Sequence, residues 1–587
     1  MPQGVRSREV DRLGLMAFPT EWILPGDGGE GSLRDRVLRG RGLVGERDQA
    51  LFASPLPPLS LLREPASLPG ADAVAATLDV WLREGLRIAV YGDYDADGLC
   101  AAALVARLLR QFGAHPSIFI PHRMDDGYGL HADALRQLRQ QGIDAVITVD
   151  CGIRSFAEAE VAAEVGLRLA ITDHHRVDRD ESGAVRLPRA EAVAHPSLGG
   201  CPFEAISGSV VAFKVASRLI RLRGGERPPE ILRRWAAEVA LPLAALGLVP
   251  DVMPLLDENR VLVANALARL PNCPLPGVQA LLRSADIDLR RLDAKAISHA
   301  IGPRLNAAGR LDAATDALCL LESDDVEAVR GAARRVEAAN TERKRRMEEL
   351  VEIAEAQAAR DGLLEPTRAT VVMGDPSWHP GLLGLAAARL LDRVNKPVLL
   401  FGGEDAMLKA SGRAPPGIDL HECMNDCASL LAKFGGHAAA AGGSMDPANL
   451  PAFIEAFERA VAVRMQGPPR PHTIRVDLTL KAHEAMRAMD ELDSLRPFGK
   501  DFPAPMIHCP ALRVRSASTM GATGDHLKVQ VQDEGSQRTT GMLLWRQGRR
   551  VGEFRAGRTL AVVGSPKRST NPRFPDDFEV RDFRFAD

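Results

Sequence analysis

The sequence contains few aromatic residues and few cysteines. Aromatic side chains make up 4% of the 587 residues, and the 8 cysteines lack the spacing of a metal site or a disulfide framework. Cys423 and Cys427 lie one helical turn apart but have no second pair, so we expect buried free thiols in a reducing compartment. No apolar run reaches the length of a membrane span, and the N-terminus lacks the pattern of a signal peptide. These absences predict a cytoplasmic protein without a membrane partner.

The chain also lacks a strong net charge. Its 74 Lys and Arg residues face 77 Asp and Glu residues, which leaves a formal charge of -3. A charge this small excludes a global field that draws the whole protein onto nucleic acid. Any binding to nucleic acid must therefore use local basic patches.

Composition and periodicity divide the chain into five segments, in line with a length that suggests about three or four domains. Residues 1–75 are rich in Arg, Gly and Pro and are predicted to form an N-terminal extension. Residues 76–322 alternate strand and helix patterns, as in an α/β domain with a parallel sheet. Residues 323–362 contain almost no Gly or Pro and predict one long connecting helix. A smaller α/β domain is expected over 363–466 and a small OB-like β-barrel over 470–587.

Three apolar runs in the first α/β domain each end in a turn rich in Asp or His. The runs cover 87–91, 145–149 and 169–172, and each reads as a buried strand. Because parallel strands place their carboxyl ends at one edge of a sheet, we expect the three turns to meet. Such a concentration of negative charge and imidazole is stable only if cations share it. The turns carry Asp93, Asp95, Asp97, Asp150, Asp173, His174 and His175.

Each turn alone has a simpler interpretation. The GDYDADG loop could be a calcium loop or a solvated turn, Asp150 a helix N-cap, and Asp251, after the apolar run 241–249, a turn residue. The adjacent His174 and His175 favour Mn²⁺, Fe²⁺ or Zn²⁺ as a direct partner of nitrogen. Taken together, the residues predict a site for two cations about 3.5–4 Å apart, which activates a water and stabilises the leaving oxygen of a phosphoryl transfer.

In order and spacing, these turns resemble the first four motifs of the DHH phosphoesterase superfamily. The matching stretches are GDYDADG at 92–98, VDCG at 149–152, DHH at 173–175, and Asp251. Within the superfamily the chain is most similar to the RecJ family, bacterial exonucleases that degrade single-stranded DNA in the 5′→3′ direction. Further matching stretches are PHRMDDGYGL at 121–130, SGSVVAFK at 207–214, PRLNAAGRL at 303–311, WHPGLLG at 378–384 and FGGH at 434–437 with Ala441 and Gly442.

The resemblance implies a role for each residue at the predicted metal site. Asp173 would orient a histidine, and His175 would face the scissile phosphate or polarise the attacking water. The catalytic set would be Asp95, Asp97, Asp150, His174 and His175. The implied cofactors are two divalent ions, Mn²⁺ or Mg²⁺. Their implied ligands are Asp93, Asp95, Asp97, Asp150, His174 and Asp251.

The resemblance also implies a set of residues that contact the substrate. Arginines grip phosphate with two hydrogen bonds, although on such loops they are more often solvated or salt-bridged. A Gly pair can form a nest of backbone amides or merely a flexible turn, and Trp378 could equally be a core residue. The implied contacts are Arg123, Tyr128, Arg304, Asn306, Arg310, Trp378, His379, Ser411, Arg413, Gly435, Gly436 and His437.

Basic residues gather in the predicted barrel. Seven Arg and Lys side chains lie between 546 and 568 against the single acid Glu553, which suits a single strand of nucleic acid or a solubilising face. Few aromatics lie nearby, Trp545 and Phe554 among them, so contact with the backbone is expected to outweigh base stacking.

The resulting hypothesis is a metal-dependent 5′→3′ exonuclease on single-stranded DNA that releases 5′-mononucleotides in recombination and repair. A monomer is expected, with single-strand-binding protein and a helicase as plausible partners. Two rivals stay open. One is a DHH phosphodiesterase of short RNA or cyclic dinucleotides, and the other is a non-catalytic replication scaffold that binds single strands.

Overall fold

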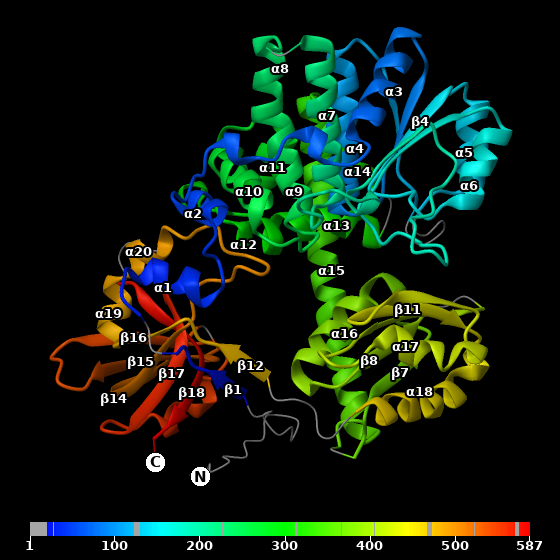
Figure 1. Ribbon diagram of the computed structural model, residues 1–587. Coiled ribbons are helices and arrows are strands. Elements are labelled where there is room, and N and C mark those ends of the chain that lie inside the picture. The colour runs from blue at the N-terminus through cyan, green and yellow to red at the C-terminus, as the bar shows by residue number, and fades with distance from the viewer. Residues whose placement is uncertain are drawn as a thin grey trace. The chain divides into compact units, whose positions relative to one another are not determined.

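The chain folds into two compact units. The computed structural model describes residues 20–26, 29–122, 129–225, 227–311, 314–365, 367–403, 406–465, 472–521, 523–569 and 575–586 (Figure 1). The larger unit comprises Trp22–Glu337 and Ile474–Asp587, and the smaller unit is centred on Ala338–Thr473. The long helix α15, Val326–Arg360, belongs to both, since the division falls within it.

A five-stranded parallel sheet lies at the centre of the first domain of the larger unit. Its strand order is β3-β2-β4-β5-β6. On β2, Ile88 and Val90 face one hydrophobic core, while Ala89 and Tyr91 face another. Both faces are therefore buried, which explains why these strands read as continuous apolar runs. The strands are β2 (Ile88–Tyr91), β3 (Ser117–Phe119), β4 (Ala145–Val149), β5 (Arg168–Thr172) and β6 (Ala192–Ala194).

Helices cover both faces of this sheet. One core joins it to α3, α4, α7 and α9, and the other joins it to α5 and α6 (Figure 1). Further helices extend the first core beyond the sheet. The bounds of the first group are α3 (Ala71–Arg83), α4 (Ala96–Gln111), α5 (Ala132–Gln140), α6 (Phe156–Glu164), α7 (Gly208–Gly224) and α9 (Leu241–Leu248). Those of the further helices are α8 (Glu230–Trp235), α10 (Asp257–Arg269), α11 (Pro276–Ser284), α12 (Ala294–Ala296), α13 (Gly302–Leu311) and α14 (Thr315–Glu322).

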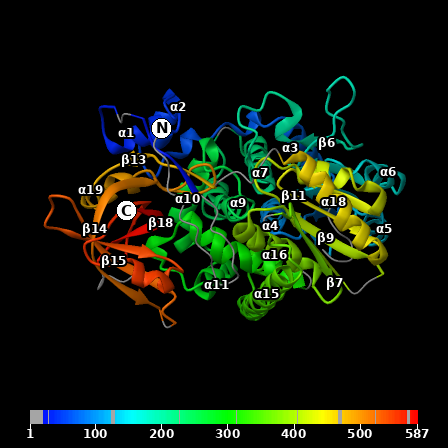
Figure 2. The ribbon, with the colours of Figure 1, turned by 90° about the horizontal axis from the view of Figure 1, so that it is seen from below.

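The C-terminal part of the larger unit is a closed β-barrel. Its strands run in the order β14-β15-β16-β18-β17, and β17 pairs antiparallel with β14 to close the ring. All five strands are labelled in Figure 1, and Figure 2 shows β14, β15 and β18 from below. The short strand β13 (Leu478–Thr479) adds to β14 in parallel, and α19 (Ala482–Arg487) and α20 (Met489–Asp493) follow it. The barrel strands are β14 (Ile507–Met520), β15 (His526–Asp533), β16 (Thr539–Leu544), β17 (Thr559–Lys567) and β18 (Asp577–Phe585).

The N-terminal segment joins the barrel to the α/β domain, a role that its composition did not reveal. Helix α1 (Leu33–Gly40) places Val37 and Leu38 in the core of the barrel, and α2 (Glu46–Phe52) places Leu51 and Phe52 there. Arg260 of α10 is fully buried beneath them, with its guanidinium 4.0 Å from the centre of the Phe52 ring. That guanidinium donates to the carbonyl oxygens of Leu51, Arg496 and Pro497. Burial lowers the pKa of Arg260 to about 9.

The smaller unit contains a mixed sheet in the order β10-β11-β9-β8-β7. Strands β7 and β8 are parallel, and the other pairs are antiparallel. Its strands are β7 (Val371–Asp375), β8 (Val398–Gly402), β9 (Leu408–Arg413), β10 (Lys433–His437) and β11 (Ala440–Met445). Its helices are α16 (Pro380–Val394), α17 (Leu420–Asn425) and α18 (Leu450–Arg464). A two-stranded sheet of β1 (Thr20–Ile23) and β12 (His472–Arg475) completes the described strands.

The predicted fold class is confirmed: a parallel α/β domain, a long connecting helix, a smaller α/β domain and a C-terminal barrel. No helix in the described part of the chain is long and apolar enough to cross a lipid bilayer.

Candidate metal centre

The GDYDADG turn connects β2 to the start of α4. Asp95 is the N-cap of α4, and its Oδ1 accepts hydrogen bonds from the amides of Asp97 at 2.9 Å and Gly98 at 3.1 Å. A Cβ atom on Gly98 would lie 2.6 Å from the backbone of Asp93. Only glycine at this position lets the loop fold back on itself. The turn thus gathers three carboxylates within a single helix start.

Asp97 is fixed by the first turn of α7. Its two carboxylate oxygens accept hydrogen bonds from the amides of Gly208 at 2.6 Å and Ser209 at 3.1 Å. Gly208 also touches Asp150, since a Cβ on Gly208 would lie 2.4 Å from Asp150 Oδ1. The SGSVVAFK stretch therefore supports the acidic cluster through backbone amides at a helix N-terminus. The motif resemblance predicted the importance of this stretch but no role for Gly208 or Ser209.

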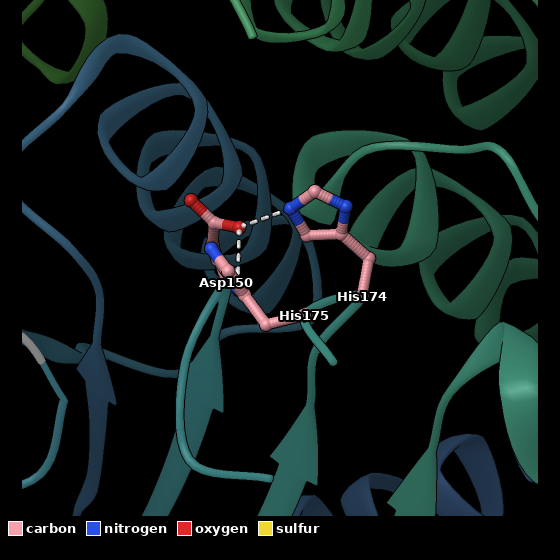
Figure 3. A group of neighbouring side chains, drawn as sticks. All are labelled: Asp150, His174 and His175. Atoms are coloured by element: carbon pink, nitrogen blue, oxygen red, sulfur yellow. Dashed lines mark ion pairs between the residues drawn. The ribbon is translucent and has the colours of Figure 1, made fainter. Parts of the chain in front are cut away.

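The two histidines after β5 reach the same point. His174 Nε2 lies 3.1 Å from Asp150 Oδ1, 3.6 Å from Asp251 Oδ2 and 3.9 Å from Asp97 Oδ2. His175 Nδ1 lies 3.8 Å from Asp150 Oδ1, and Figure 3 shows the contacts of both rings with Asp150. Carboxylates and imidazoles from separate turns thus converge around Asp150 and His174.

Asp173 anchors the histidine turn. One of its oxygens lies 2.8 Å from His175 Nδ1 and also accepts the amides of His174 and His175. Its other oxygen accepts the amide of Ile153. Although burial opposes ionisation, the hydrogen bond with His175 holds the pKa of Asp173 well below its usual range. Burial lowers the pKa of His175, but the hydrogen bond with Asp173 outweighs it and raises that pKa to about 9.

Burial and like charges oppose ionisation of other carboxylates in the cluster. Burial and the neighbouring carboxylates raise the pKa of Asp95 and Asp150, and they raise that of Asp251 to about 9. Among the described residues, His174 Nε2 and Asp251 Oδ2 are buried without a hydrogen-bond partner. Divalent cations would satisfy both atoms and offset the charge.

The side chains fall into three groups whose ligand atoms lie within 4.8 Å of one another. Asp150 is shared by two of the groups, and His174 is also shared by two. The donors are mostly carboxylate oxygens with imidazole nitrogen, which fits Mn²⁺ well and Mg²⁺ through the oxygens. The groups are Asp150 with His174 and His175, Asp97 with His174 and Asp251, and Asp93 with Asp95 and Asp150.

The predicted phosphate contacts of the larger unit do not form one group among the residues that the structure describes. Arg123, Tyr128 and the side chain of Arg310 lie outside the described part of the structure. Arg304 is 7% exposed, and its guanidinium is held by Glu337 at 2.6 Å and by the carbonyls of Ser284 and Ala300. This arginine locks α13 in place, so its geometry supports the salt-bridged interpretation and not a grip on phosphate.

Asn306 supports the metal loop through its side-chain carbonyl. Its Oδ1 accepts the amide of Ala96 at 2.7 Å, at the beginning of α4. Three residues later in α13, a Cβ on Gly309 would lie 2.8 Å from the carbonyl oxygen of Tyr94. The PRLNAAGRL helix therefore packs directly on the turn that carries Asp95 and Asp97.

In the smaller unit, the structure brings together part of the predicted set. Ser411 and Arg413 lie on β9, and Gly384 of α16 packs against both, since its Cβ would lie 2.8 Å from Ser411 Oγ. The predicted Gly435, Gly436 and His437 lie on β10, two strands away across β11. Residues of β9 and β10 thus share one region of the sheet.

The two remaining predicted contacts have structural roles in this unit. Trp378 is 4% exposed within a hydrophobic core, which favours the core interpretation. His379 caps α16, because its Nδ1 accepts the amide of Gly381 at 3.1 Å, and burial lowers its pKa.

Comparison with known proteins agrees with this architecture. Family models match the DHH family N-terminal domain at residues 87–243, the DHHA1 domain at 367–463 and the RecJ OB domain at 476–571. The single-stranded-DNA-specific exonuclease RecJ of Escherichia coli is 34% identical over 489 residues, which cover 80% of this chain and 82% of that protein. The chain belongs to the RecJ family.

Other RecJ proteins support this conclusion. RecJ of Bacillus subtilis is 30% identical over 479 residues, and the match covers 81% of this chain but 58% of that longer protein. The crystal structure of RecJ from Thermus thermophilus with Mn²⁺ has a TM-score of 0.77 at 28% identity and covers 96% of this chain and 80% of its own. The corresponding structure with Mg²⁺ has a TM-score of 0.72 at 27% identity, covering 96% and 78%. The resemblance to this family, predicted from the motifs, is confirmed.

Proposed function

We propose that this chain is a metal-dependent exonuclease that hydrolyses single-stranded DNA from the 5′ end and releases 5′-mononucleotides. The observation that carries the proposal is the convergence of Asp97, Asp150, His174 and Asp251 within one largely buried cluster. Membership of the RecJ family makes the substrate single-stranded DNA and the cofactor Mn²⁺ or Mg²⁺. Its role is in DNA recombination and repair.

Two divalent ions, when bound, lower the pKa of a water and offset the charge that develops on the phosphate. Asp150 would be a shared ligand, because it belongs both to the group with Asp93 and Asp95 and to the group with His174 and His175. Asp97 and Asp251 would hold an ion together with His174.

His175 is placed to act on the substrate. The hydrogen bond between Asp173 and Nδ1 fixes the imidazole orientation, so Nε2 lies on the far side of the ring from Asp173. A histidine fixed in this way donates a proton to a phosphate oxygen in a constant direction. Asp173 is a positioning residue for this role.

Two further groups of side chains, one in the smaller unit and one on the barrel, are proposed to contact DNA. Ser411, Arg413 and His437 are proposed to bind the 5′-terminal phosphate, since hydroxyl, guanidinium and imidazole groups all donate to phosphate oxygens. On the barrel, Trp545 is 39% exposed beside Lys567, whose Nζ lies 4.9 Å from the ring centre. Arg550, Lys567 and Arg568 are paired with acidic side chains, which leaves fewer of the predicted basic residues for contact with DNA.

The direct test uses oligonucleotides of matched sequence, labelled at the 5′ or 3′ end, as single strands and as blunt duplexes. With Mn²⁺ we expect a 5′ label to be released at once as a mononucleotide, a 3′ label to shorten progressively, and the duplex to resist. Short RNA and a cyclic dinucleotide serve as competing substrates. Faster cleavage of either, or binding of single strands without cleavage, would favour one of the two rival functions.

We also propose a location, an oligomeric state and partners for the enzyme. It acts in the cytoplasm as a monomer, with single-strand-binding protein and a helicase as partners. Size-exclusion chromatography with light scattering tests the monomer, and co-purification with each partner tests the contacts.

A further inference from the structure

The helix that delivers Asp251 ends in an unusual way. After α9, the amide of Val252 donates to the carbonyl of Val249 at 3.2 Å, and the amide of Met253 donates to that of Leu248 at 3.4 Å. This pair of bonds is the Schellman ending of a helix, which requires a left-handed residue at Val252, where φ is 60°. Glycine normally occupies this position, because a β-branched side chain there clashes with its own backbone.

Val252 differs from the other left-handed residues. In the part of the chain that the structure describes, the other non-glycine residues with positive φ are Asp or Asn, apart from Arg546. Asp and Asn tolerate this conformation, while valine does not. Burial does not explain the valine, because its side chain is 58% exposed. It is the only β-branched residue among the left-handed positions described.

Contacts on both sides hold the strained segment in place. Pro250 packs against the start of α13, since a Cβ on Gly302 would lie 2.7 Å from the Pro250 ring. Asn259 Nδ2 donates to the carbonyl of Pro254 at 3.0 Å, and the amide of Leu255 donates to the carbonyl of Lys500 at 2.9 Å. Strain of this kind persists only where the surroundings enforce it, and it concentrates at functional sites.

The backbone path alone does not require valine, because glycine follows it without strain. The isopropyl group is instead largely exposed, and it belongs to the residue that follows Asp251, a carboxylate of the metal centre. We propose that Val252 contacts the sugar or base of the nucleotide whose phosphate lies at the metal centre, and so positions that phosphate. An apolar side chain suits a sugar or base edge better than a phosphate. This inference rests on the proposed function.

The test compares V252G and V252T with D286G. Asp286 is a matched control, since its φ is 51° and its amide bonds the carbonyl of Arg283 just after α11, as Val252 bonds Val249. We expect V252G to raise the unfolding temperature by about 2–4 °C, because glycine relieves the strain. We also expect its KM for a 5′-phosphorylated oligonucleotide to rise about tenfold, with kcat within about twofold of the wild-type value. V252T keeps the branched shape and the strain, so its unfolding temperature should match the wild type, with a smaller rise in KM.

The control should gain stability without any change in KM. A V252G variant that is more stable yet keeps the wild-type KM would overturn the inference, because the side chain would then have no role with substrate. A lower unfolding temperature in V252G would also overturn it, because the valine would then serve the fold. Failure of the wild-type enzyme to cut single strands would instead refute the proposed function, and the inference with it.

Discussion

Two regions of the larger unit bury charged side chains in opposite ways. Asp257 receives two guanidinium groups, from Arg47 at 2.7 Å and Arg63 at 2.6 Å, and these ion pairs lower its pKa against the effect of burial. At the metal centre, the pKa of Asp150 and Asp251 is raised, because burial and like charges dominate. Where the protein itself compensates a buried charge, as at Asp257, the ion pairs hold parts of the fold together, and we call Asp257 with Arg47 and Arg63 the joint. Where burial and like charges dominate, as at Asp150 and Asp251, the arrangement indicates a site for cations.

The joint also contains a buried ion pair between Lys214 and Glu258, 2.8 Å apart. Together with Arg260, it ties the N-terminal segment and the barrel to the α/β domain. The comparison predicts that substitutions at the joint reduce stability, while substitutions at the metal centre reduce activity.

The largest effect is expected at Asp150. D150N removes the carboxylate that two ligand groups share, so cleavage of single-stranded DNA with Mn²⁺ should fall by about 10³-fold or more. The metal-free variant should be at least as stable as the wild type, because the substitution removes a buried charge. Single-turnover cleavage and thermal unfolding in EDTA measure the two effects. Normal turnover in D150N would contradict the assignment of this residue.

A substitution at the joint should give the reverse pattern. R260M keeps the apolar stem but leaves the carbonyls of Leu51, Arg496 and Pro497 without their donor, at a cost of about 3 kcal/mol. We expect a lower denaturant midpoint and a kcat close to that of the wild type. A large loss of kcat in folded R260M would break the distinction between the two regions.

The gain in protein stability on Mn²⁺ binding should depend on the metal centre and not on the joint. At a Mn²⁺ concentration about 100 times its dissociation constant, the wild-type protein should gain about 2.7 kcal/mol. D150N should gain much less, whereas R260M should gain as much as the wild type. Thermal unfolding with and without EDTA provides the measurement, and equal stabilisation of all three proteins would place the binding elsewhere.

The smallest expected effect is on the pH dependence of stability. The pKa of Asp251 is 3.8 in the unfolded chain and about 9 in the folded protein, so metal-free protein loses stability as pH rises from about 4 to about 9. Asp257 has a lowered pKa, so its contribution is present at neutral pH and is lost only in acid. In EDTA, D251N should therefore flatten the loss of stability between about pH 4 and about pH 9 and leave the contribution of Asp257 in acid unchanged. An unchanged slope in that window would show that Asp251 is not the group responsible.

The local sequence predicted the position of residues that lie in the turn directly after a strand. Asp95, Asp150 and His174 could be predicted to meet, because parallel strands end at a common edge and each residue directly follows a strand. The ion pair of Arg304 could not be predicted, because its partner Glu337 lies 33 residues further along the chain, on α15. Trp378 was ambiguous for a similar reason: an apolar ring next to a motif has the same sequence signature in a core as in a site.

By itself, the sequence determined the fold class and the family, and it predicted the carboxylates and histidines that the structure gathers around Asp150 and His174. These follow from patterns of period two and 3.6 and from side chains at strand ends, which are local properties of the chain. The tertiary structure alone decided which buried charges are compensated, that residues 29–75 join the barrel to the α/β domain, and that Val252 is strained. Those features depend on contacts between segments far apart in the chain, which local patterns do not encode.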